Sequence, residues 1–538
     1  MSKLYLTNGT IPFFNEISDE VDTIEIESGR ITRVGSSVDM LPGSRSSKNI
    51  IDLQQAVVFP GFTDSHIHLL KYGLSLHTID LSGATKSECL QRIAKKTSEI
   101  PVGEWIIGHG WDQNDWQDGF GTIDDLDAIS MQHPIYLTHK SLHCAWLNSL
   151  ALRLSGIDDK REDPPGGTIL RDEKENPLGI LLESAMELVN KILPEQNSGD
   201  VESALRTAQQ SLNALGITAV HDFDPWMVYT TLGEMAQNNT VSLRVTKGIP
   251  ENHLDQAISA QYKSGFGNDW VRIGWLKLFA DGALGPQTAA MIDPYLGSDN
   301  NGMLLLNLEN ICEYGEKSLS AGIAMAVHAI GDQANQVVLQ AYEKLSRNSF
   351  LSIPALPSRI EHVQLLAQED IQTLGELGVL ASMQPIHAVS DKEMAQAFWG
   401  DRCQRAYAWR SLLENDTNLI FGSDAPVESP NPFHGIAAAI SRRSFFSPSK
   451  GQSNQGWVTN QCINLNAAIL AYTQKPGQVS GFRGLEKPFH PGSFADLVIL
   501  PPNFLELSPE QIHFSKPVAT MVDGKWVYIN DNIDIELF

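Results

Sequence analysis

The chain has 538 residues, more than one ordinary domain holds, and with 42% hydrophobic and 19% charged residues it has the composition of a globular protein. Its formal net charge of −25 disfavours binding to nucleic acid or anionic lipid, because such binding needs clustered Lys and Arg. The five cysteines are far apart and form no CxxC pair, which indicates neither a disulfide framework nor a thiolate zinc site. The composition therefore favours a small-molecule partner.

Both ends of the chain carry short strand patterns separated by turn residues. Near the N-terminus no basic stretch precedes an apolar one, and no run reaches the roughly 18 apolar residues of a membrane span. We therefore expect a cytoplasmic protein and a β-sandwich built from residues 1–57 and 485–538. The predicted strands are Lys3–Leu6, Thr23–Ile26, Ile31–Val34, Ala495–Leu500 and Met521–Tyr528.

The central region, residues 58–484, alternates buried-type strands with helical segments, as parallel βαβ units do. With the apolar strand before His66, eight strands are expected, which predicts a closed (β/α)8 barrel with its active site at the C-terminal strand ends. Residues from about 75 to 200 interrupt this alternation and are expected to form an inserted lid domain. The other seven predicted strands are Ile217–His221, Leu243–Lys247, Ile273–Phe279, Ile323–Ala329, Arg359–Val363, Val379–Gln384 and Leu419–Gly422.

Polar side chains end several of these strands. His66 and His68 are two positions apart, so an extended strand points both imidazoles to the same side. His328, His362 and Asp424 each follow an apolar strand. A hydrogen-bonded structural role would explain any one of them, but four imidazoles and a carboxylate together form a ligand set suited to zinc or a similar divalent ion.

Lys277 lies within an apolar strand, where an unpaired ammonium group would be costly to bury. A salt bridge to a neighbouring carboxylate is the simpler explanation. The alternative is that carbon dioxide has converted the amine to a carbamate, which removes the positive charge and can bridge two cations. Desolvation lowers the pKa of a lysine and so favours the neutral amine that reacts.

The motifs as a set resemble the amidohydrolase superfamily, and within it the third amidohydrolase family, that of the YtcJ-like proteins. The resemblance covers essentially the whole chain. It is carried by Pro60-Gly61-Phe62-Thr63-Asp64-Ser65-His66-Ile67-His68, Phe279-Ala280-Asp281-Gly282-Ala283-Leu284-Gly285, His328-Ala329-Ile330-Gly331-Asp332, Gly422-Ser423-Asp424-Ala425-Pro426-Val427-Glu428 and His143-Cys144-Ala145-Trp146-Leu147-Asn148-Ser149.

The resemblance implies a binuclear metal site, with zinc as the expected metal. Some members of the superfamily hold a single ion, so the sequence leaves the number of ions, one or two, undecided. It places His66 and His68 on one metal and His328 and His362 on the other. It implies that carboxylated Lys277 bridges the two ions and that Asp424 completes the first.

The resemblance also implies hydrolysis of an amide-type C–N bond by a metal-activated hydroxide, with Asp424 as general base and then acid. N-substituted formamides and other small N-acyl compounds are the expected substrates. A deaminase or cyclic-amide hydrolase is one alternative. Deaminases of the superfamily are expected to carry a His-x-x-Glu motif, however, and this chain has Gly331 at the position of the glutamate. A non-catalytic regulatory or binding protein on the same scaffold is another. A homo-oligomer is possible, but no segment marks an interface.

Four further residues are candidates for orienting the substrate rather than binding metal. They are His387, which follows the seventh predicted strand, Asp281 and His143, which lie in family-like motifs, and Trp111 in the insertion. A structural role is an equally good reading of His387, Asp281 and His143, and a tryptophan in a Gly-rich turn is more often a packing anchor.

Overall fold

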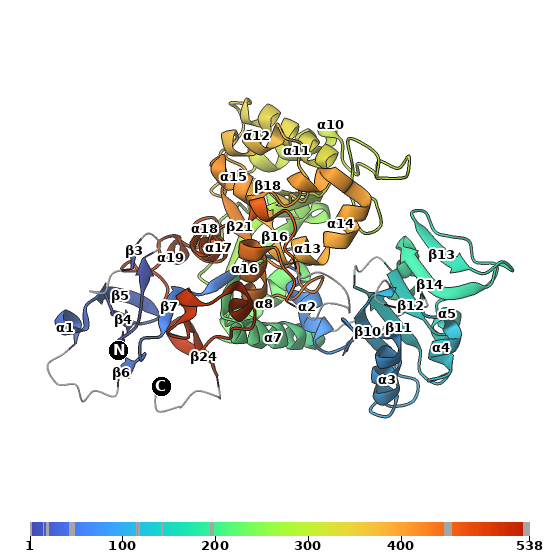
Figure 1. The fold of residues 1–538 in the computed structure, drawn as a ribbon, viewed down its shortest axis with the longest axis horizontal. Coiled ribbons are helices and arrows are strands. Elements are labelled where there is room, and N and C mark those ends of the chain that lie inside the picture. The colour runs from blue at the N-terminus through green and yellow to red at the C-terminus, as the bar shows by residue number, and fades with distance from the viewer. Residues whose placement is uncertain are drawn as a thin grey trace. The chain divides into compact units, whose positions relative to one another are not determined.

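The computed structural model describes residues 3–13, 16–17, 21–41, 49–113, 116, 119–140, 144–193, 198–445 and 455–530. The chain divides into two compact units (Figure 1). The first unit contains residues 1–69 and 208–538, and the second contains residues 70–207.

The first unit is built around a sheet of eight parallel strands in the order β21-β20-β19-β18-β17-β16-β15-β8. A parallel bridge between Ile67 and Ala425, with a 2.9 Å hydrogen bond from the His68 N–H to the Ala425 carbonyl, joins the two edges of the sheet. This closure confirms the predicted (β/α)8 barrel. The strands are β8 (Phe62–Ile67), β15 (Ile217–Asp222), β16 (Arg244–Pro250), β17 (Val271–Phe279), β18 (Ala324–Ala329), β19 (Arg359–His362), β20 (Leu380–Met383) and β21 (Leu419–Phe421).

The apolar run before His66 differs from the single strand that the sequence predicts. The structure divides it at Gly61 into β7 (Val57–Pro60), which pairs with the C-terminal strand β22, and β8, which begins the barrel. A Cβ atom on Gly61 would lie 2.1 Å from Oγ1 of Thr218. Glycine therefore lets the chain pass from one sheet to the other while β8 and β15 stay in contact.

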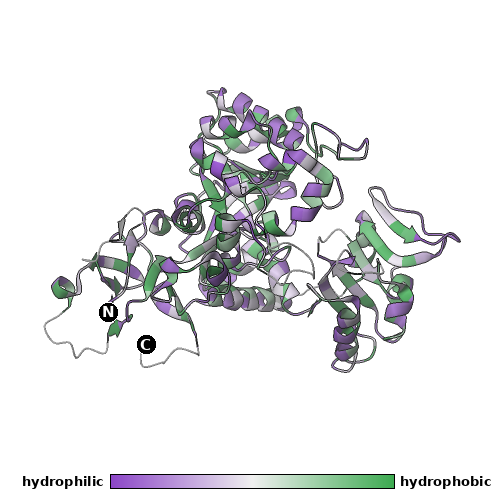
Figure 2. Cartoon of the chain, in the orientation of Figure 1, coloured by the Kyte–Doolittle hydropathy of each residue, from purple (hydrophilic) through white to green (hydrophobic). Residues whose placement is uncertain are grey.

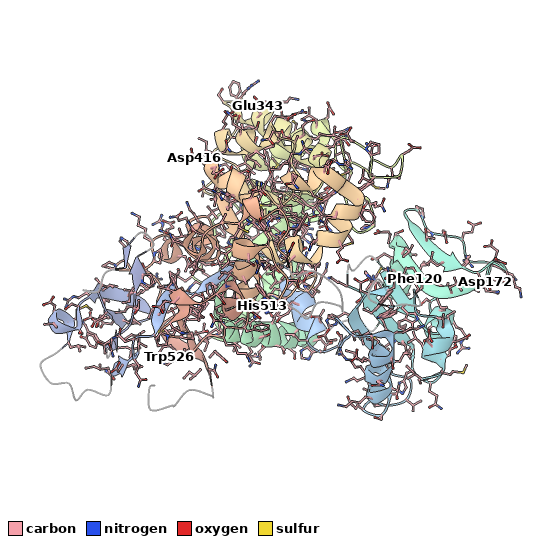
Figure 3. The ribbon with its side chains drawn as sticks, in the orientation of Figure 1. Phe120, Asp172, Glu343, Asp416, His513 and Trp526 are labelled. Carbon is pink, nitrogen blue, oxygen red and sulfur yellow. The ribbon has the colours of Figure 1, made fainter. Side chains whose placement is uncertain are left out.

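Helices follow the barrel strands, and α10, α16, α17 and α20 begin at a residue whose side chain caps the helix. The side chain of Asn307, for example, accepts a 2.9 Å hydrogen bond from the backbone N–H of Asn310 at the start of α10. Their outer faces are charged, as at Glu343 on α11, which pairs with Arg347 (Figure 3). The helices are α7 (Ser198–Ala214), α8 (Met227–Gln237), α9 (Leu254–Ser259), α10 (Leu308–Ser320), α11 (Asp332–Ser346), α12 (Asp370–Glu376), α13 (Pro385–Ser390), α14 (Lys392–Trp399), α15 (Trp409–Glu414), α16 (Pro432–Ser441), α17 (Leu465–Tyr472), α18 (Gln474–Gln478), α19 (Arg483–Glu486) and α20 (Pro509–His513).

Two four-stranded sheets from the chain ends share one apolar core, which includes Leu6, Ile24, Val58, Leu497 and Met521. Because β7 pairs with β22, the two ends of the chain form one sandwich. One sheet has the order β5-β4-β1-β6, and the other has β24-β23-β22-β7. The strands are β1 (Leu4–Thr7), β4 (Thr23–Glu27), β5 (Arg30–Gly35), β6 (Ile50–Asp52), β22 (Leu497–Leu500), β23 (Ala519–Val522) and β24 (Lys525–Ile529).

The second unit has its own mixed sheet, in the order β13-β14-β12-β11-β10-β9, and its own core around three tryptophans, Trp111, Trp116 and Trp146. Apolar residues gather in its strands, whereas hydrophilic residues dominate α3 (Figure 2). Its elements are β9 (Ile79–Asp80), α3 (Lys86–Thr97), β10 (Ile106–Trp111), α4 (Ile123–Asp127), β11 (Ile135–His139), β12 (Cys144–Leu147), α5 (Ser149–Leu154), β13 (Gly167–Arg171), β14 (Pro177–Glu183) and α6 (Glu187–Asn190). Helix α2 (Leu69–Ser75) begins at the boundary of the two units.

Across the described residues, we find no helix with the length and apolar character that crossing a bilayer requires.

Candidate metal centre

Three metal-ligating side chains converge at the C-terminal end of the barrel strands. One ligand atom from each of His66, His362 and Asp424 lies within 4.8 Å of the other two. The residues come from β8, from β19 and from the segment after β21, so the closed barrel brings them together. All three are buried, with at most 9% of any residue exposed.

The other two predicted strand-end histidines join this cluster. His68 places Nε2 3.5 Å from Oδ1 of Asp424, the same separation as Nε2 of His66. The ring centres of His328 and His362 lie 4.5 Å apart. The five predicted strand-end residues therefore surround one small volume.

Each imidazole uses one ring nitrogen to contact a protein group. Nδ1 of His66 lies 2.6 Å from the Glu361 carboxylate, and Nδ1 of His68 lies 3.2 Å from Asp224. The partner of His362 Nδ1 is the Gln384 side-chain oxygen at 2.9 Å, and that of His328 Nε2 is the Gly282 carbonyl at 2.9 Å. Such contacts fix the ring orientation, and a metal ion would bind the second nitrogen of each ring.

Burial keeps three of these imidazoles, those of His66, His328 and His362, in the neutral form that binds metal. It lowers the pKa of His66 to about 4 and that of His328 to about 3, and it holds the pKa of His362 well below its usual range. Burial alone would raise the pKa of Asp424, but the hydrogen bond with His68 is the largest of the effects that lower that pKa well below its usual range. The centre therefore presents neutral imidazoles and one carboxylate.

Lys277 is buried, and among the described residues its Nζ makes no hydrogen bond and no salt bridge. It lies 4.6 Å from the ring centre of Phe279 and 5.1 Å from that of Phe223. The described residues therefore do not supply the salt bridge that would most simply explain a buried lysine. Burial lowers the pKa of Lys277 to about 8, which increases the share of neutral amine. An orphaned buried amine beside this ligand set fits a divalent metal centre.

The candidate substrate residues His387 and Asp281 both lie near the centre. The rings of His387 and His362 stack with centres 6.3 Å apart, and Nε2 of His387 has no hydrogen-bond partner among the described residues. Asp281 instead accepts backbone hydrogen bonds of 2.9 to 3.0 Å from Ala290, Ile330 and Gly331, which tie the loop after β17 to the start of α11. Asp281 thus joins these two segments of the backbone.

The two candidates from the insertion have different outcomes. Trp111 is fully buried in the core of the second unit, where its indole N–H donates a 2.9 Å hydrogen bond to the Leu137 carbonyl. This places it among the packing residues of the unit, stacked on Trp116 with ring centres 5.6 Å apart. His143 lies outside the described residues.

The polar residues that contact the histidine rings were not predicted from the sequence. Glu361 precedes His362 directly and shares a strand face with Arg359, so two charges in one short barrel strand were the available signal. Asp224 and Gln384 had no such signal, because each lies just beyond a strand in an ordinary loop pattern.

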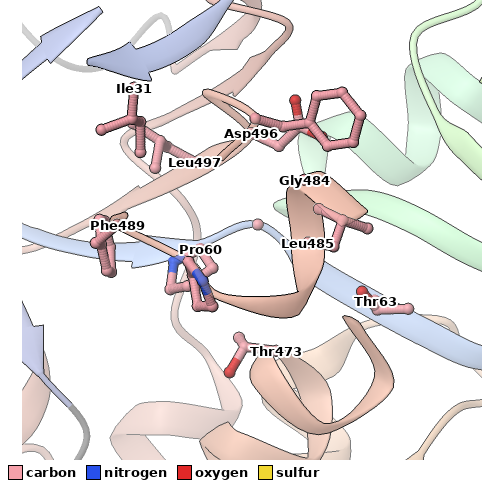
Figure 4. Close-up of a pocket in the computed structure, with 12 residues that line it drawn as sticks. Ile31, Pro60, Thr63, Thr473, Gly484, Leu485, Phe489, Asp496 and Leu497 are labelled. Atoms are coloured by element: carbon pink, nitrogen blue, oxygen red, sulfur yellow. The ribbon is translucent and has the colours of Figure 1, made fainter. Parts of the chain in front are cut away.

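A separate small pocket lies where the barrel meets the sandwich (Figure 4). Pro60, at the end of β7, and Thr63, near the start of β8, line it together with Asp496 and Leu497 at the start of β22. Its 12 lining residues include no histidine. The active sites of barrel enzymes lie at the opposite face, where the strands have their C-terminal ends.

Known proteins match this architecture over nearly the full chain. The chain is 30% identical to YtcJ of Bacillus subtilis, over 95% of this chain and 97% of that one. It is 23% identical to an N-substituted formamide deformylase of Arthrobacter pascens, over 97% of this chain and 98% of the relative. The structure of an uncharacterized metal-dependent hydrolase from Pyrococcus horikoshii superposes with a TM-score of 0.76 at 28% identity, covering 94% of this chain and 99% of that chain.

The model of the amidohydrolase family matches residues 49–528, which include both the barrel and the sandwich strands of the C-terminal end. This match and the full-length relatives agree with the histidine and aspartate cluster at the barrel's C-terminal end. The chain belongs to the amidohydrolase family.

Proposed function

We propose that this protein is a metal-dependent hydrolase that cleaves the amide-type C–N bond of a small N-acyl compound, with N-substituted formamides as the first candidates. The convergence of His66, His362 and Asp424 within 4.8 Å is the observation that carries the proposal. The full-length similarity to an N-substituted formamide deformylase supports the choice of substrate class.

The residues that would hold the metal are those that surround the centre. His66, His68, His328, His362 and Asp424 offer the nitrogen and oxygen ligands that zinc takes, and a carbamate on Lys277 would add a bridging oxygen ligand. A bound Zn²⁺ would lower the pKa of an attacking water and would polarise the substrate carbonyl.

Asp424 is the group that we assign to proton transfer. Its Oδ1 lies between Nε2 of His66 and Nε2 of His68, at 3.5 Å from each, which fixes the carboxylate beside the position of attack. Because its pKa is held well below the usual range, Asp424 is ionised at neutral pH and accepts the proton of the attacking water. It then returns the proton to the leaving nitrogen, so that a free amine and a carboxylic acid result.

An apolar ring, that of Phe279, and the Nε2 atom of His387 flank this position. The ring of Phe279 is 46% exposed and its centre lies 5.3 Å from that of His328, which suits an apolar substituent on the substrate. Nε2 of His387 is available to hydrogen-bond a substrate oxygen or N–H. These two side chains favour an uncharged N-alkyl or N-aryl amide.

The proposal is tested by incubating the zinc-loaded protein with N-benzylformamide, with its N-acetyl counterpart and with an aminopurine. Formation of formate and benzylamine in equal amounts supports the proposal, and Asp424→Asn is the control that removes turnover. Release of ammonia from the aminopurine alone would assign the centre to deamination instead. Metal-loaded protein that turns over neither class would favour the non-catalytic binding role.

A further inference from the structure

A fully buried ion pair lies directly behind His66 in the barrel interior. Glu361 and Arg359 are both unexposed, with 2.5 Å between Oε1 of Glu361 and Nε of Arg359. Nη2 of Arg359 also donates a 2.9 Å hydrogen bond to Oε2 of Glu361. The same Oε2 lies 2.6 Å from Nδ1 of His66. A barrel interior is ordinarily filled by branched apolar residues, so charges at this level call for an explanation.

Arg359 hydrogen-bonds to residues of three other strands and contacts a ring on a fourth. Its Nη2 donates to the Ser65 carbonyl of β8 at 2.6 Å and to the Ser382 hydroxyl of β20 at 2.5 Å. Its Nη1 donates to Nδ1 of His221 on β15 at 2.9 Å. The guanidinium also lies 4.5 Å from the ring centre of Trp275 on β17. Because the planar guanidinium group of Arg359 is bound by these neighbours, the Glu361 carboxylate paired with it has little freedom to move.

This arrangement determines which nitrogen of His66 carries the proton. An ionised carboxylate only accepts hydrogen bonds, so the Nδ1 that faces Glu361 is the protonated one. Nε2 of His66 then keeps its lone pair and points toward Asp424 at 3.5 Å. The other three histidines also face oxygen acceptors, but at longer distances of 2.9 Å for His362 and His328 and 3.2 Å for His68, compared with 2.6 Å for His66.

We propose that Glu361, anchored by Arg359, is a positioning residue that fixes His66 in the tautomer and orientation in which Nε2 binds the metal ion. The proposal rests on the metal-dependent function proposed above, but it concerns metal affinity and not the substrate. Carboxylates that orient a metal-binding histidine typically change metal affinity by about 10- to 100-fold when they are removed.

The test compares three variants by zinc affinity, measured in competition with a fluorescent chelator, and by thermal unfolding of the metal-free protein. Glu361→Gln removes the carboxylate but leaves Arg359 buried without its partner, so it is expected to lose both affinity and stability. The double variant Arg359→Met with Glu361→Gln removes the unpaired charge as well. It is expected to recover stability while its zinc affinity stays about 10- to 100-fold below that of the wild type.

Asp496→Asn is the matched control. Asp496 forms an equally buried two-point ion pair with Arg244, at 2.5 and 2.9 Å, where the barrel meets the sandwich, and it contacts no metal-centre histidine. It is expected to lower stability and to leave zinc affinity unchanged. If the double variant does not fold, the zinc affinity of Glu361→Asp is measured instead. Aspartate keeps the negative charge of the ion pair, but its shorter side chain places the carboxylate farther from His66.

A folded double variant, or Glu361→Asp, with wild-type zinc affinity would overturn the proposal and show that the pair is only structural. Zinc affinity lost equally in Asp496→Asn would overturn it too, because any loss of stability would then weaken metal binding. Wild-type protein that binds zinc but hydrolyses no amide would refute the proposed function while leaving this inference to stand on the affinities.

Discussion

Nε2 of His66 lies 3.5 Å from Oδ1 of Asp424, although the two residues belong to the first and the last strand regions of the barrel. Backbone hydrogen bonds maintain this proximity, since the Asp424 N–H donates to the His66 carbonyl at 2.7 Å. The metal centre and the closure of the barrel therefore depend on the same contact between β8 and the segment after β21.

Replacing Asp424 tests its proton-transfer role. Asp424→Asn keeps the size of the side chain but cannot accept a proton from the attacking water, so kcat should fall by about 10²- to 10⁴-fold. Steady-state kinetics at saturating zinc measure the change. Elemental analysis of the same sample shows whether the histidines still retain metal, and a metallated variant with wild-type kcat would assign proton transfer to another group.

Lys277 is predicted to carry a carbamate. Lys277→Met keeps most of the apolar volume but removes the amine, so the bridging ligand cannot form and metal content per chain should fall. Incubation of the wild type with ¹³C-bicarbonate should give a carbamate carbon signal in ¹³C NMR spectra. The variant should lack that signal, and unchanged metal content in Lys277→Met would mean that the amine has no part in metal binding.

The closure of the barrel beside the metal centre has no room for a larger residue at Gly422. A Cβ atom there would lie 2.4 Å from the backbone nitrogen of His66 and 2.6 Å from Oδ1 of Asp64. Gly422→Ala should therefore push β21 away from β8, lower stability by about 1–3 kcal/mol and weaken zinc binding. Thermal unfolding and zinc titration measure the two effects.

Gly233→Ala is the control for this substitution. Gly233 lies in α8, and a Cβ atom at this position meets no atom within 4 Å. Alanine in a helix interior is favoured over glycine by roughly 0.5–1 kcal/mol, so this variant should be slightly more stable and bind zinc normally. Equal behaviour of the two variants would contradict the close contact at Gly422.

The histidine pair between α16 and α20 predicts acid sensitivity that is independent of the metal centre. The rings of His434 and His513 stack with centres 4.2 Å apart, and His513 marks this place in Figure 3. Burial, and then the charge of His513, lowers the pKa of His434 from 6.5 to about 4. The unfolded chain therefore takes up a proton first, and the stability contributed by neutral His434 is complete above pH 6.5 and lost as the pH falls toward 4.

The loss from this single group amounts to at most about 3 kcal/mol. His434→Gln removes the titration, so the melting temperature of the variant should fall less than that of the wild type between pH 7 and pH 4.5. A parallel fall in both proteins would show that His434 does not cause the acid sensitivity.

The barrel could be predicted from the sequence because most of its buried strands are apolar runs, and several of them lead into a polar residue. The predicted and observed strands, such as Ile217–His221 and β15 (Ile217–Asp222), agree closely. The division of the run before His66 could not be predicted, because β7 and β8 are both fully buried and no polar residue marks the change of sheet at Gly61.

The metal-ligand candidates could be predicted for the same reason that the strands could, since His66, His328 and Asp424 lie at strand ends. Their supporting groups could not. Glu361 and Asp224 belong to different strand regions from the histidines that they contact, and only the closed barrel brings them together. Trp111 was a candidate for orienting the substrate, although a tryptophan in a Gly-rich turn is more often a packing anchor, and its ring lies in an apolar core.

The most direct test of the central claim is a zinc titration of metal-depleted protein with N-benzylformamide hydrolysis as the readout. We predict no formate release without metal and a rate that rises in proportion to added zinc until the centre is filled. Full hydrolysis by metal-depleted protein, or no hydrolysis of any N-acyl compound by the filled protein, would contradict the assignment of this centre to amide hydrolysis.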